Sequence, residues 1–152
     1  MLLPHTDLIA TTKKTAHENW QTLYTESINN KGKFYGSIQA KIPQKPWFDK
    51  ITNTRKLIIT LTRIRLNHAN TPKFQHRIGQ IASPHCSCDN KSIADIRHLI
   101  MECKKYETQR SELLNSLKKN NINIENNYKS LITNKETYKH IMKFVNECDL
   151  NL

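Results

Sequence analysis

Residues 86–103 of the chain read Cys-Ser-Cys-Asp-Asn-Lys-Ser-Ile-Ala-Asp-Ile-Arg-His-Leu-Ile-Met-Glu-Cys. Three cysteines and one histidine occur here with the spacing C-x-C-x9-H-x4-C, namely Cys86, Cys88, His98 and Cys103. Three thiolates and one imidazole form the ligand set of a closed tetrahedral zinc site, and soft ligands favour Zn²⁺ over Mg²⁺ or Ca²⁺. Because four protein ligands leave no open position for a reactive water, the stretch predicts a structural Zn²⁺ site rather than a catalytic one.

Two features of the spacing are unusual for such a site. His98 and Cys103 lie five residues apart, which is about 140° around an ideal α-helix, so they converge only if the helix distorts or ends near Met101-Glu102. The single residue between Cys86 and Cys88 is also fewer than the two to four that zinc motifs usually have. The alternative is that Cys86 and Cys88 are loop thiols, Cys103 a core thiol and His98 a residue on a helix surface.

The composition indicates an acidic partner. The 152 residues carry a formal net charge of +11, and only 37% are hydrophobic, below the roughly 45–50% of average globular domains. Such an excess of Lys and Arg favours a polyanion, either nucleic acid or an anionic membrane surface.

The N-terminus and the cysteines bear on the compartment. No stretch approaches the ~20 apolar residues of a membrane span, and the first seven residues lack the basic and apolar regions of a signal peptide. We therefore expect an intracellular chain, nuclear or cytoplasmic and not secreted, or a fragment of a longer one. In a reducing compartment, cysteines are metal ligands or buried thiols more often than disulfides.

The fold class predicted is mainly α, with several short helices around a small core and an inserted CCHC zinc knuckle at 86–103. We expect three segments: an N-terminal helix and Pro-containing connector over 1–50, a helical core with the knuckle over 51–119, and an Asn-rich loop with a C-terminal helix over 120–152. Glycine is scarce and no window of six residues alternates cleanly, so strands are poorly supported.

Caps and apolar spacing place the individual helices. A Thr71-Pro72 pair should open a short helix bearing Phe74, Ile78 and Ile81, and Ser92-Ile93-Ala94-Asp95 has the form of a capping box. The residues from Lys33 to Lys50 predict an extended, docked connector, and those from Asn120 to Asn127 a polar loop. The remaining helices are expected at Asp7–Ser27, with Asp7 as the cap, at Asn53–His68, at Tyr106–Lys119 and after Asn134. The last of them should present one apolar face, formed by Tyr138, Ile141, Met142, Val145 and Cys148.

The ordered set of motifs resembles the C-terminal region of polyproteins of non-LTR (LINE-type) retrotransposons, particularly arthropod elements of the jockey group. The similarity covers roughly Leu3 to Leu117, and the family pattern is similar to L-x-R-L-R-x-G-H, P-x-C-x-C and H-x-x-x-x-C-x-x-Y-x-x-x-R. Asn67 stands where the family has Gly. The matching residues are Pro4-His5-Thr6-Asp7-Leu8, Trp20-Gln21, Arg55, Leu61–His68, Arg77-Ile78-Gly79, Ser83–Cys88, Arg97–Cys103, Tyr106 and Arg110.

The resemblance implies a segment downstream of reverse transcriptase and, where present, ribonuclease H. It also implies zinc at the four CCHC residues and a role in gripping template RNA or target DNA, in a chain that is an excised tail or a transposon remnant. Basic side chains flank the motif on both sides and suit phosphate contacts, which position a nucleic acid but do not specify its sequence. The residues concerned are Arg63, Arg65, His68, Lys73, His76, Arg77, Lys91, Arg97, Lys104, Lys105 and Arg110.

For each of these basic residues, the alternative is a solvated surface charge. Trp20, Trp47 and Tyr106 could stack on bases, but their helical context favours core positions. The chain is not expected to be an enzyme, because its 13 carboxylates do not cluster as Mg²⁺-dependent polymerases or nucleases require and no phosphate-binding loop occurs.

A second function from a different class stays open. The tail could be a protein-interaction clasp that docks on the preceding ribonuclease H or polymerase domain. Its interface would then be the apolar side chains of the first helix, Leu8, Ile9, Trp20 and Leu23.

Overall fold

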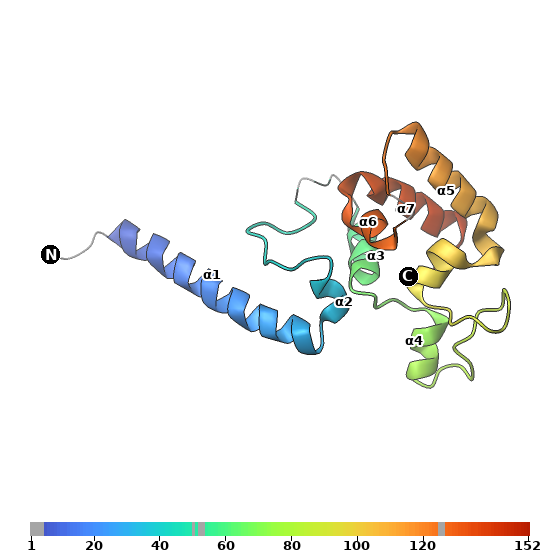
Figure 1. Cartoon of the computed structure of the whole chain (residues 1–152), viewed down its shortest axis with the longest axis horizontal. Coiled ribbons are helices and arrows are strands. Elements are labelled where there is room, and N and C mark those ends of the chain that lie inside the picture. The colour runs from blue at the N-terminus through green and yellow to red at the C-terminus, as the bar shows by residue number, and fades with distance from the viewer. Residues whose placement is uncertain (1–4, 50, 52–53, 125–126) are drawn as a thin grey trace. The chain divides into compact units, whose positions relative to one another are not determined.

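Helices make up most of the chain in a computed structural model that describes residues 5–49, 51, 54–124 and 127–152 (Figure 1). The described residues form no β-strand, and their one isolated β-bridge joins His85 to Ile93. The fold is therefore mainly α, as predicted. The chain divides into two units, an N-terminal unit (Met1–Asp49) and a C-terminal unit (Lys50–Leu152).

The N-terminal unit consists of a long helix and a segment that folds back on it. Helix α1 spans His5–Asn30, so Asp7 lies inside the helix rather than at its start, and the short helix α2 (Lys33–Gly36) interrupts the predicted extended connector. A Cβ at Gly36 would lie 2.7 Å from the Ile28 Cβ, so glycine is needed where α2 approaches α1. The Gln21 side chain accepts a hydrogen bond from the Ile42 N–H (2.8 Å) and donates one to the Ala40 carbonyl (3.3 Å), which holds the returning segment against α1.

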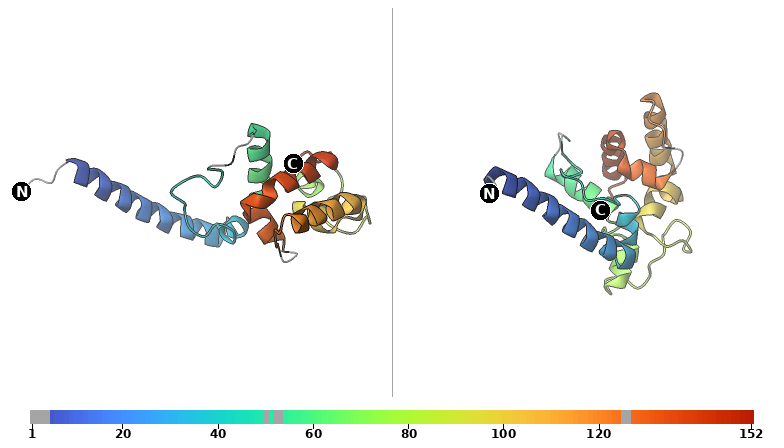
Figure 2. Two further views of the ribbon diagram at one scale, coloured as in Figure 1. Left: turned by 90° about the horizontal axis from the view of Figure 1, so that it is seen from above. Right: turned by 60° about the vertical axis from the view of Figure 1, so that its left-hand side comes forward.

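The hydrophobic core of the C-terminal unit lies between four helices, α3 (Arg55–Arg65), α5 (Glu107–Lys119), α6 (Tyr128–Thr133) and α7 (Tyr138–Glu147). Helices α5 and α7 lie side by side, and α3 packs on both α6 and α7 (Figures 1 and 2). The predicted face of the last helix is confirmed, because its five apolar residues are all buried. The fully buried side chains include Leu61, Ile64, Leu117, Leu131, Ile132, Tyr138, Ile141 and Phe144.

Threonine caps set the starts of two helices. The Thr54 hydroxyl accepts from the Leu57 N–H at 3.5 Å, and the Thr71 hydroxyl accepts from the Phe74 N–H at 3.4 Å, which satisfies one of the unpaired N–H groups that every helix start leaves. Helix α3 begins at Arg55. The start predicted for it, Asn53, lies two residues earlier and outside the described residues. The capping role predicted for Thr71 in α4 (Pro72–Arg77) is confirmed.

Three predicted elements differ in the structure. Helix α4 ends at Arg77, and Ile78 and Ile81 beyond it are 49% and 36% exposed, so they do not continue an apolar helical face. The Asn-rich loop is not wholly polar, because Ile122 and Ile124 are buried against the core. Helix α6, absent from the prediction, follows this loop.

The described helices include none whose length and apolar character would allow it to cross a membrane.

Candidate metal centre

A short π-helix brings His98 and Cys103 together. The element η1 (His98–Glu102) is wound with i→i+5 hydrogen bonds, and the Cys103 N–H donates to the His98 carbonyl at 2.7 Å. This wider turn is the distortion that the five-residue spacing required, because it returns residue i+5 toward residue i. His98 and Cys103 are 5% and 0% exposed, so both residues are buried.

Asp95, not Ser92, caps this helix. The Asp95 Oδ1 accepts from the His98 N–H at 3.0 Å, which places the cap three residues later than the predicted capping box. Ser92 is used elsewhere, because its hydroxyl and its N–H both donate to the carboxylate of Asp89. The helix starts at Ile96, directly after Asp95 and four residues after Ser92.

A tight loop presents the other two cysteines. The Cys86 N–H donates to the Ser92 carbonyl, and the Cys86 carbonyl accepts from the Asn90 N–H, both at 2.8 Å. Asn90 adopts a positive φ of 55°, a conformation that Asn tolerates better than most residues. Asp89 closes the loop by accepting from the N–H groups of Lys91 and Ser92 (3.0 and 2.9 Å), and the bonds from Ser92 and Lys91 hold the pKa of its carboxyl well below the usual range.

The four potential ligand atoms form one compact cluster. All lie within 4.8 Å of one another; the Sγ atoms of Cys86 and Cys103 are 3.5 Å apart, and the Cys88 Sγ is 3.4 Å from the His98 Nε2. In a tetrahedron with Zn–S and Zn–N bonds of ordinary length, the S–S and S–N edges are about 3.8 and 3.6 Å. The cluster could therefore hold a metal ion after small movements of the side chains.

The second ring nitrogen of His98 faces a carboxylate. Its Nδ1 lies 3.8 Å from the Glu102 Oε2, while the Glu102 Oε1 pairs with the Arg97 Nε at 3.2 Å. Metal-bound histidines commonly direct their other ring N–H toward such an acceptor, which orients the ring. Glu102 was not predicted as part of the site, although its position four residues after His98 could have indicated it.

Arg110 supports the cluster from α5. Its Nη1 donates to the Cys103 carbonyl at 2.8 Å, so the guanidinium fixes the backbone of a ligand. This half-buried contact differs from the exposed phosphate contact predicted for Arg110.

The fourth cysteine of the chain lies outside the cluster. Cys148 is 9% exposed at the end of α7, and burial raises the pKa of its thiol to about 11. Burial also raises the pKa of the Cys88 thiol.

The two arginines of α3 have different surroundings. Arg65 is 3% exposed, and its Nη1 donates to the Ile132 carbonyl and to the Tyr138 hydroxyl, both at 3.1 Å. This residue cannot reach a phosphate, so its predicted nucleic-acid contact is wrong; the reason is that α3 directs position 65 toward α6 and α7. Arg63 is exposed, and it donates to the Leu152 carbonyl at 3.0 Å.

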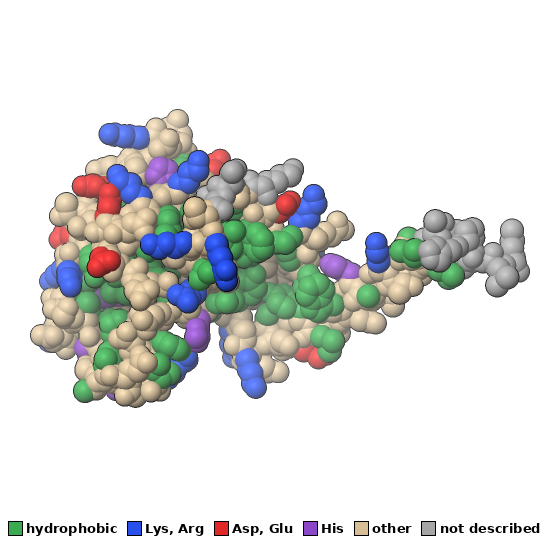
Figure 3. Space-filling model, turned by 180° about the vertical axis from the view of Figure 1, so that it is seen from behind, with side chains coloured by type: hydrophobic (Ala, Val, Ile, Leu, Met, Phe, Trp, Pro, Cys, Tyr) green, Lys and Arg blue, Asp and Glu red, His purple; other side chains and the backbone are tan. Residues whose placement is uncertain are grey.

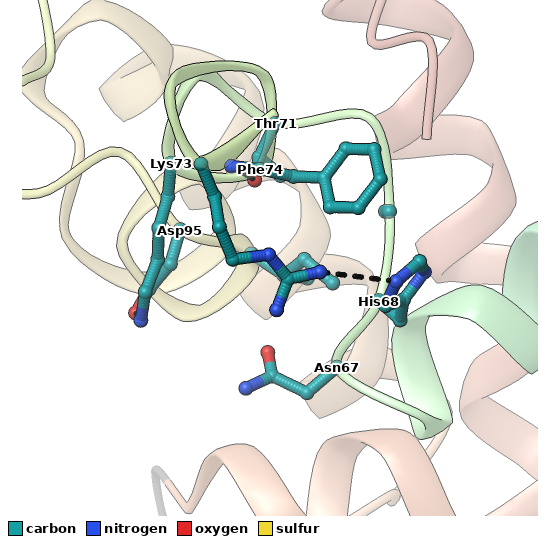
Figure 4. A pocket seen from close by; sticks show the side chains of 9 residues that line it. Asn67, His68, Thr71, Lys73, Phe74 and Asp95 are labelled. Carbon is teal, nitrogen blue, oxygen red and sulfur yellow. Dashed lines mark hydrogen bonds and ion pairs between the residues drawn. The ribbon is translucent and has the colours of Figure 1, made fainter. Parts of the chain in front are cut away.

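Three of the other predicted basic residues line one cavity of about 170 Å³. Figure 4 shows His68 and Lys73 on opposite sides of it, with Asp95 beside Lys73 and the ring of Phe74 on the side of His68, the two ring centroids 4.7 Å apart. The third, Arg77, contacts the His68 ring. Asn67, Phe74 and Asp95 also line this cavity, and the sequence prediction included none of them in a binding site.

The remaining basic residues are spread over the surface. The side chains of Lys91, Arg97, Lys104 and Lys105 are exposed, and so is that of His76. Figure 3 shows Lys and Arg side chains scattered over the visible face, with carboxylates between them rather than in one continuous block.

Among the aromatic residues considered for stacking, Trp20 departs from the prediction. It is 59% exposed on α1, so the expected core position is wrong for this residue. Tyr106 is half-buried with its ring at the edge of Phe144, the centroids 6.4 Å apart, and Trp47 is half-buried against Phe48.

Comparisons of the chain with protein-family models, with curated proteins and with solved structures find no match.

Proposed function

We propose that the cluster of Cys86, Cys88, His98 and Cys103 holds Zn²⁺. The observation that supports it is the convergence of three sulfur atoms and one imidazole nitrogen within 4.8 Å. Zinc accepts this donor set in tetrahedral geometry, whereas Mg²⁺ and Ca²⁺ require oxygen ligands. The ion would join the loop 86–92 to the π-helix and to the core behind it.

We further propose that the chain is a non-catalytic, zinc-stabilised nucleic-acid-binding tail of a non-LTR retrotransposon reverse transcriptase, which grips template RNA or target DNA. The net charge of +11 supports a polyanionic partner. Lys91 lies between the ligands Cys88 and His98, and Lys104 and Lys105 directly follow the ligand Cys103; all three lysines are exposed. A bound ion would therefore hold the backbone that carries them.

The proposal assigns the ion a structural role and no chemical step. Each ligand position would be filled by a protein side chain, which leaves no place for a zinc-bound water. The free thiolates that zinc needs fit a nuclear or cytoplasmic location, where cysteines stay reduced.

Metal analysis and salt-dependent binding test the two parts separately. The chain purified without added metal should contain one zinc per molecule by mass spectrometry under native conditions. Binding to labelled single-stranded RNA, single-stranded DNA and duplex DNA should be followed by fluorescence anisotropy at several salt concentrations. Phosphate contacts predict a linear fall of log affinity with log salt; no binding at low salt would contradict the nucleic-acid function and leave the metal site untouched.

A second candidate function is a protein-interaction clasp that docks on the ribonuclease H or polymerase part of the parent polyprotein. The observation that favours it is the exposure of large apolar side chains along α1, with Leu8, Trp20 and Leu23 at 50%, 59% and 62%. An apolar interface would bind with little dependence on salt, so the same titration against the upstream domains distinguishes the two functions. A Trp20→Ala, Leu23→Ala variant should then lose the protein partner and keep nucleic-acid binding.

A further inference from the structure

The cavity beside α4 has the size of a single aromatic ring. Its volume is about 170 Å³, and an apolar cavity of about 150 Å³ in another protein accommodates one benzene molecule. Its walls come from two backbone segments, one within residues 67–77 and one at residues 95–96. The Lys73 N–H donates to the Ala94 carbonyl at 3.2 Å, which holds α4 next to the second segment. The cavity is thus built by packing within the C-terminal unit.

Arg77 offers a flat surface in this cavity. Its guanidinium lies over the ring of Phe74, 5.0 Å from the centroid, and its Nη2 contacts the His68 Nε2 at 3.3 Å. Since a guanidinium has only donors, a hydrogen bond between the two groups requires the His68 Nε2 to accept. The dashed line in Figure 4 marks this bond at His68.

These contacts orient the guanidinium for stacking. The Arg77 guanidinium carbon lies over the Phe74 ring, and Arg77 is exposed, so a ligand can reach the guanidinium from the solvent side. Unstacked nucleobases commonly stack on arginine planes as well as on aromatic rings. Among the described residues, no carboxylate forms an ion pair with Arg77.

The polar groups around the cavity differ from one side to the other. Asp95 offers a carboxylate, with Oδ1 bonded to the His98 N–H and Oδ2 at 3.3 Å from the Lys73 Nζ. A carboxylate has about four lone-pair sites, so Asp95 retains capacity to accept from a ligand. Asn67 contributes an amide, which both donates and accepts.

We propose that this cavity binds one unstacked cytosine of a single-stranded nucleic acid, which deepens the proposed nucleic-acid function and rests on it. The cytosine would stack on Arg77, and its exocyclic N4 amine would donate to Asp95. Carboxylates are the side chains that accept from this amine. Uracil and thymine carry the O4 carbonyl oxygen at the same position. This oxygen has a partial negative charge, so the Asp95 carboxylate would repel it.

Three labelled strands of equal length test this inference, one of deoxycytidine, one of deoxyuridine and one of abasic sites. The strand of deoxycytidine should bind about tenfold more tightly than that of deoxyuridine, because one hydrogen bond is replaced by a repulsion. The abasic strand carries the phosphates without bases and should bind most weakly.

Asp95→Asn is the decisive variant. The Oδ1 of the asparagine can still accept from the His98 N–H and cap the helix. The amide nitrogen that takes the place of Oδ2 donates hydrogen bonds instead of accepting them. Affinity for deoxycytidine should fall and affinity for deoxyuridine should rise, so that the preference is lost or inverted. The metal content and the melting temperature, measured on the same sample, report any loss of the cap at His98 or of the ion pair with Lys73. Because such a loss would weaken binding of all strands alike, the ratio of the affinities for deoxycytidine and deoxyuridine is the deciding value.

Asn67→Gly removes a polar group of the cavity without disturbing the backbone. Asn67 has a φ of 52°, a conformation that Gly adopts freely. We expect a several-fold loss of affinity for deoxycytidine. Asn121→Gly is the matched control, because Asn121 has a φ of 56° and is exposed after α5, away from the cavity lining; its affinity should be unchanged.

Each remaining outcome overturns the inference in a distinguishable way. Equal affinities for deoxycytidine and deoxyuridine that Asp95→Asn leaves unchanged would refute the cytosine site and leave the proposed function standing. Binding of the abasic strand as tight as that of the deoxycytidine strand would show that phosphate contacts alone account for the affinity, and would refute the base site. Absence of binding to every strand at low salt would refute both the inference and the proposed function.

Discussion

The backbone N–H of Cys103 donates to the carbonyl of His98, five residues earlier, at 2.7 Å. An α-helix would pair residues four apart, so this bond inserts one extra residue in the turn. The consequence is that two buried side chains, separated by five positions, converge on the sulfur atoms of Cys86 and Cys88. The π-turn is thus the local feature on which the metal centre depends.

Cys103→Ser should remove the bound metal and destabilise the C-terminal unit. A structural zinc contributes on the order of 10 kcal/mol in small sites, so loss of one ligand should lower both metal content and melting temperature. Cys148→Ser is the matched control, because Cys148 is also buried but lies outside the cluster. Equal metal content in wild type and Cys103→Ser would contradict the assignment of the ligand.

Glu102→Gln should weaken metal binding without abolishing it. The carboxylate lies 3.8 Å from the His98 Nδ1, and the loss of such outer partners typically costs about 10–100-fold in metal affinity. The affinity can be measured by competition with a chelating dye. Glu107→Gln, on the first turn of α5, should leave the affinity unchanged; if both variants behave alike, Glu102 does not orient the histidine.

Arg65→Ala should reduce stability and leave the salt dependence of nucleic-acid binding intact. The guanidinium makes two buried hydrogen bonds, to Ile132 and Tyr138, and we expect a loss of about 2–4 kcal/mol in the free energy of unfolding. Urea denaturation measures this loss. Arg55→Ala, at an exposed position of the same helix, should have little effect; a reduced salt slope for Arg65→Ala would contradict the inward role.

The double variant Lys104→Ala, Lys105→Ala should lower the salt slope of nucleic-acid binding. Both side chains are exposed directly after the ligand Cys103, and two phosphate contacts account for about 1.4–1.8 of the slope. Anisotropy titrations at several salt concentrations give this value. The control is Lys118→Ala, Lys119→Ala at the end of α5, since it removes the same charge at a different place; equal effects of the two variants would indicate only a general attraction.

The pKa of the Cys148 thiol makes stability depend on pH in the alkaline range. Burial raises this pKa to about 11, whereas an unfolded thiol ionises near a pKa of about 8.5. Between these values the unfolded state loses its proton and the folded state keeps it, so stability should fall as pH rises above about 8.5. The difference in unfolding free energy between wild type and Cys148→Ala should narrow over this range; a constant difference would contradict the raised pKa.

Local sequence chemistry was sufficient for several features of the molecule. The C-x-C-x9-H-x4-C spacing identified four side chains that do converge, because ligand type and number restrict the alternatives. The Thr71-Pro72 pair predicted a cap that is present, and the apolar spacing after Asn134 predicted a buried face that is buried. The required distortion between His98 and Cys103 could also be inferred, since it follows from the geometry of an ideal helix.

Other features depended on which way each side chain faces once the helices pack. Arg63 and Arg65 look alike in the sequence, yet Arg63 is exposed and Arg65 is 3% exposed, because α6 and α7 cover only one side of α3. Asn67 illustrates the same limit, since its φ of 52°, a conformation that Asn tolerates better than most residues, is visible only in the structure. The cavity beside α4 joins Asn67 to Asp95 across 28 positions, and no spacing rule connects residues that meet only because two backbone segments pair through Lys73 and Ala94. Chain-local rules determine caps and ligand types, whereas long-range packing decides which charges stay at the surface and which polar groups face one another.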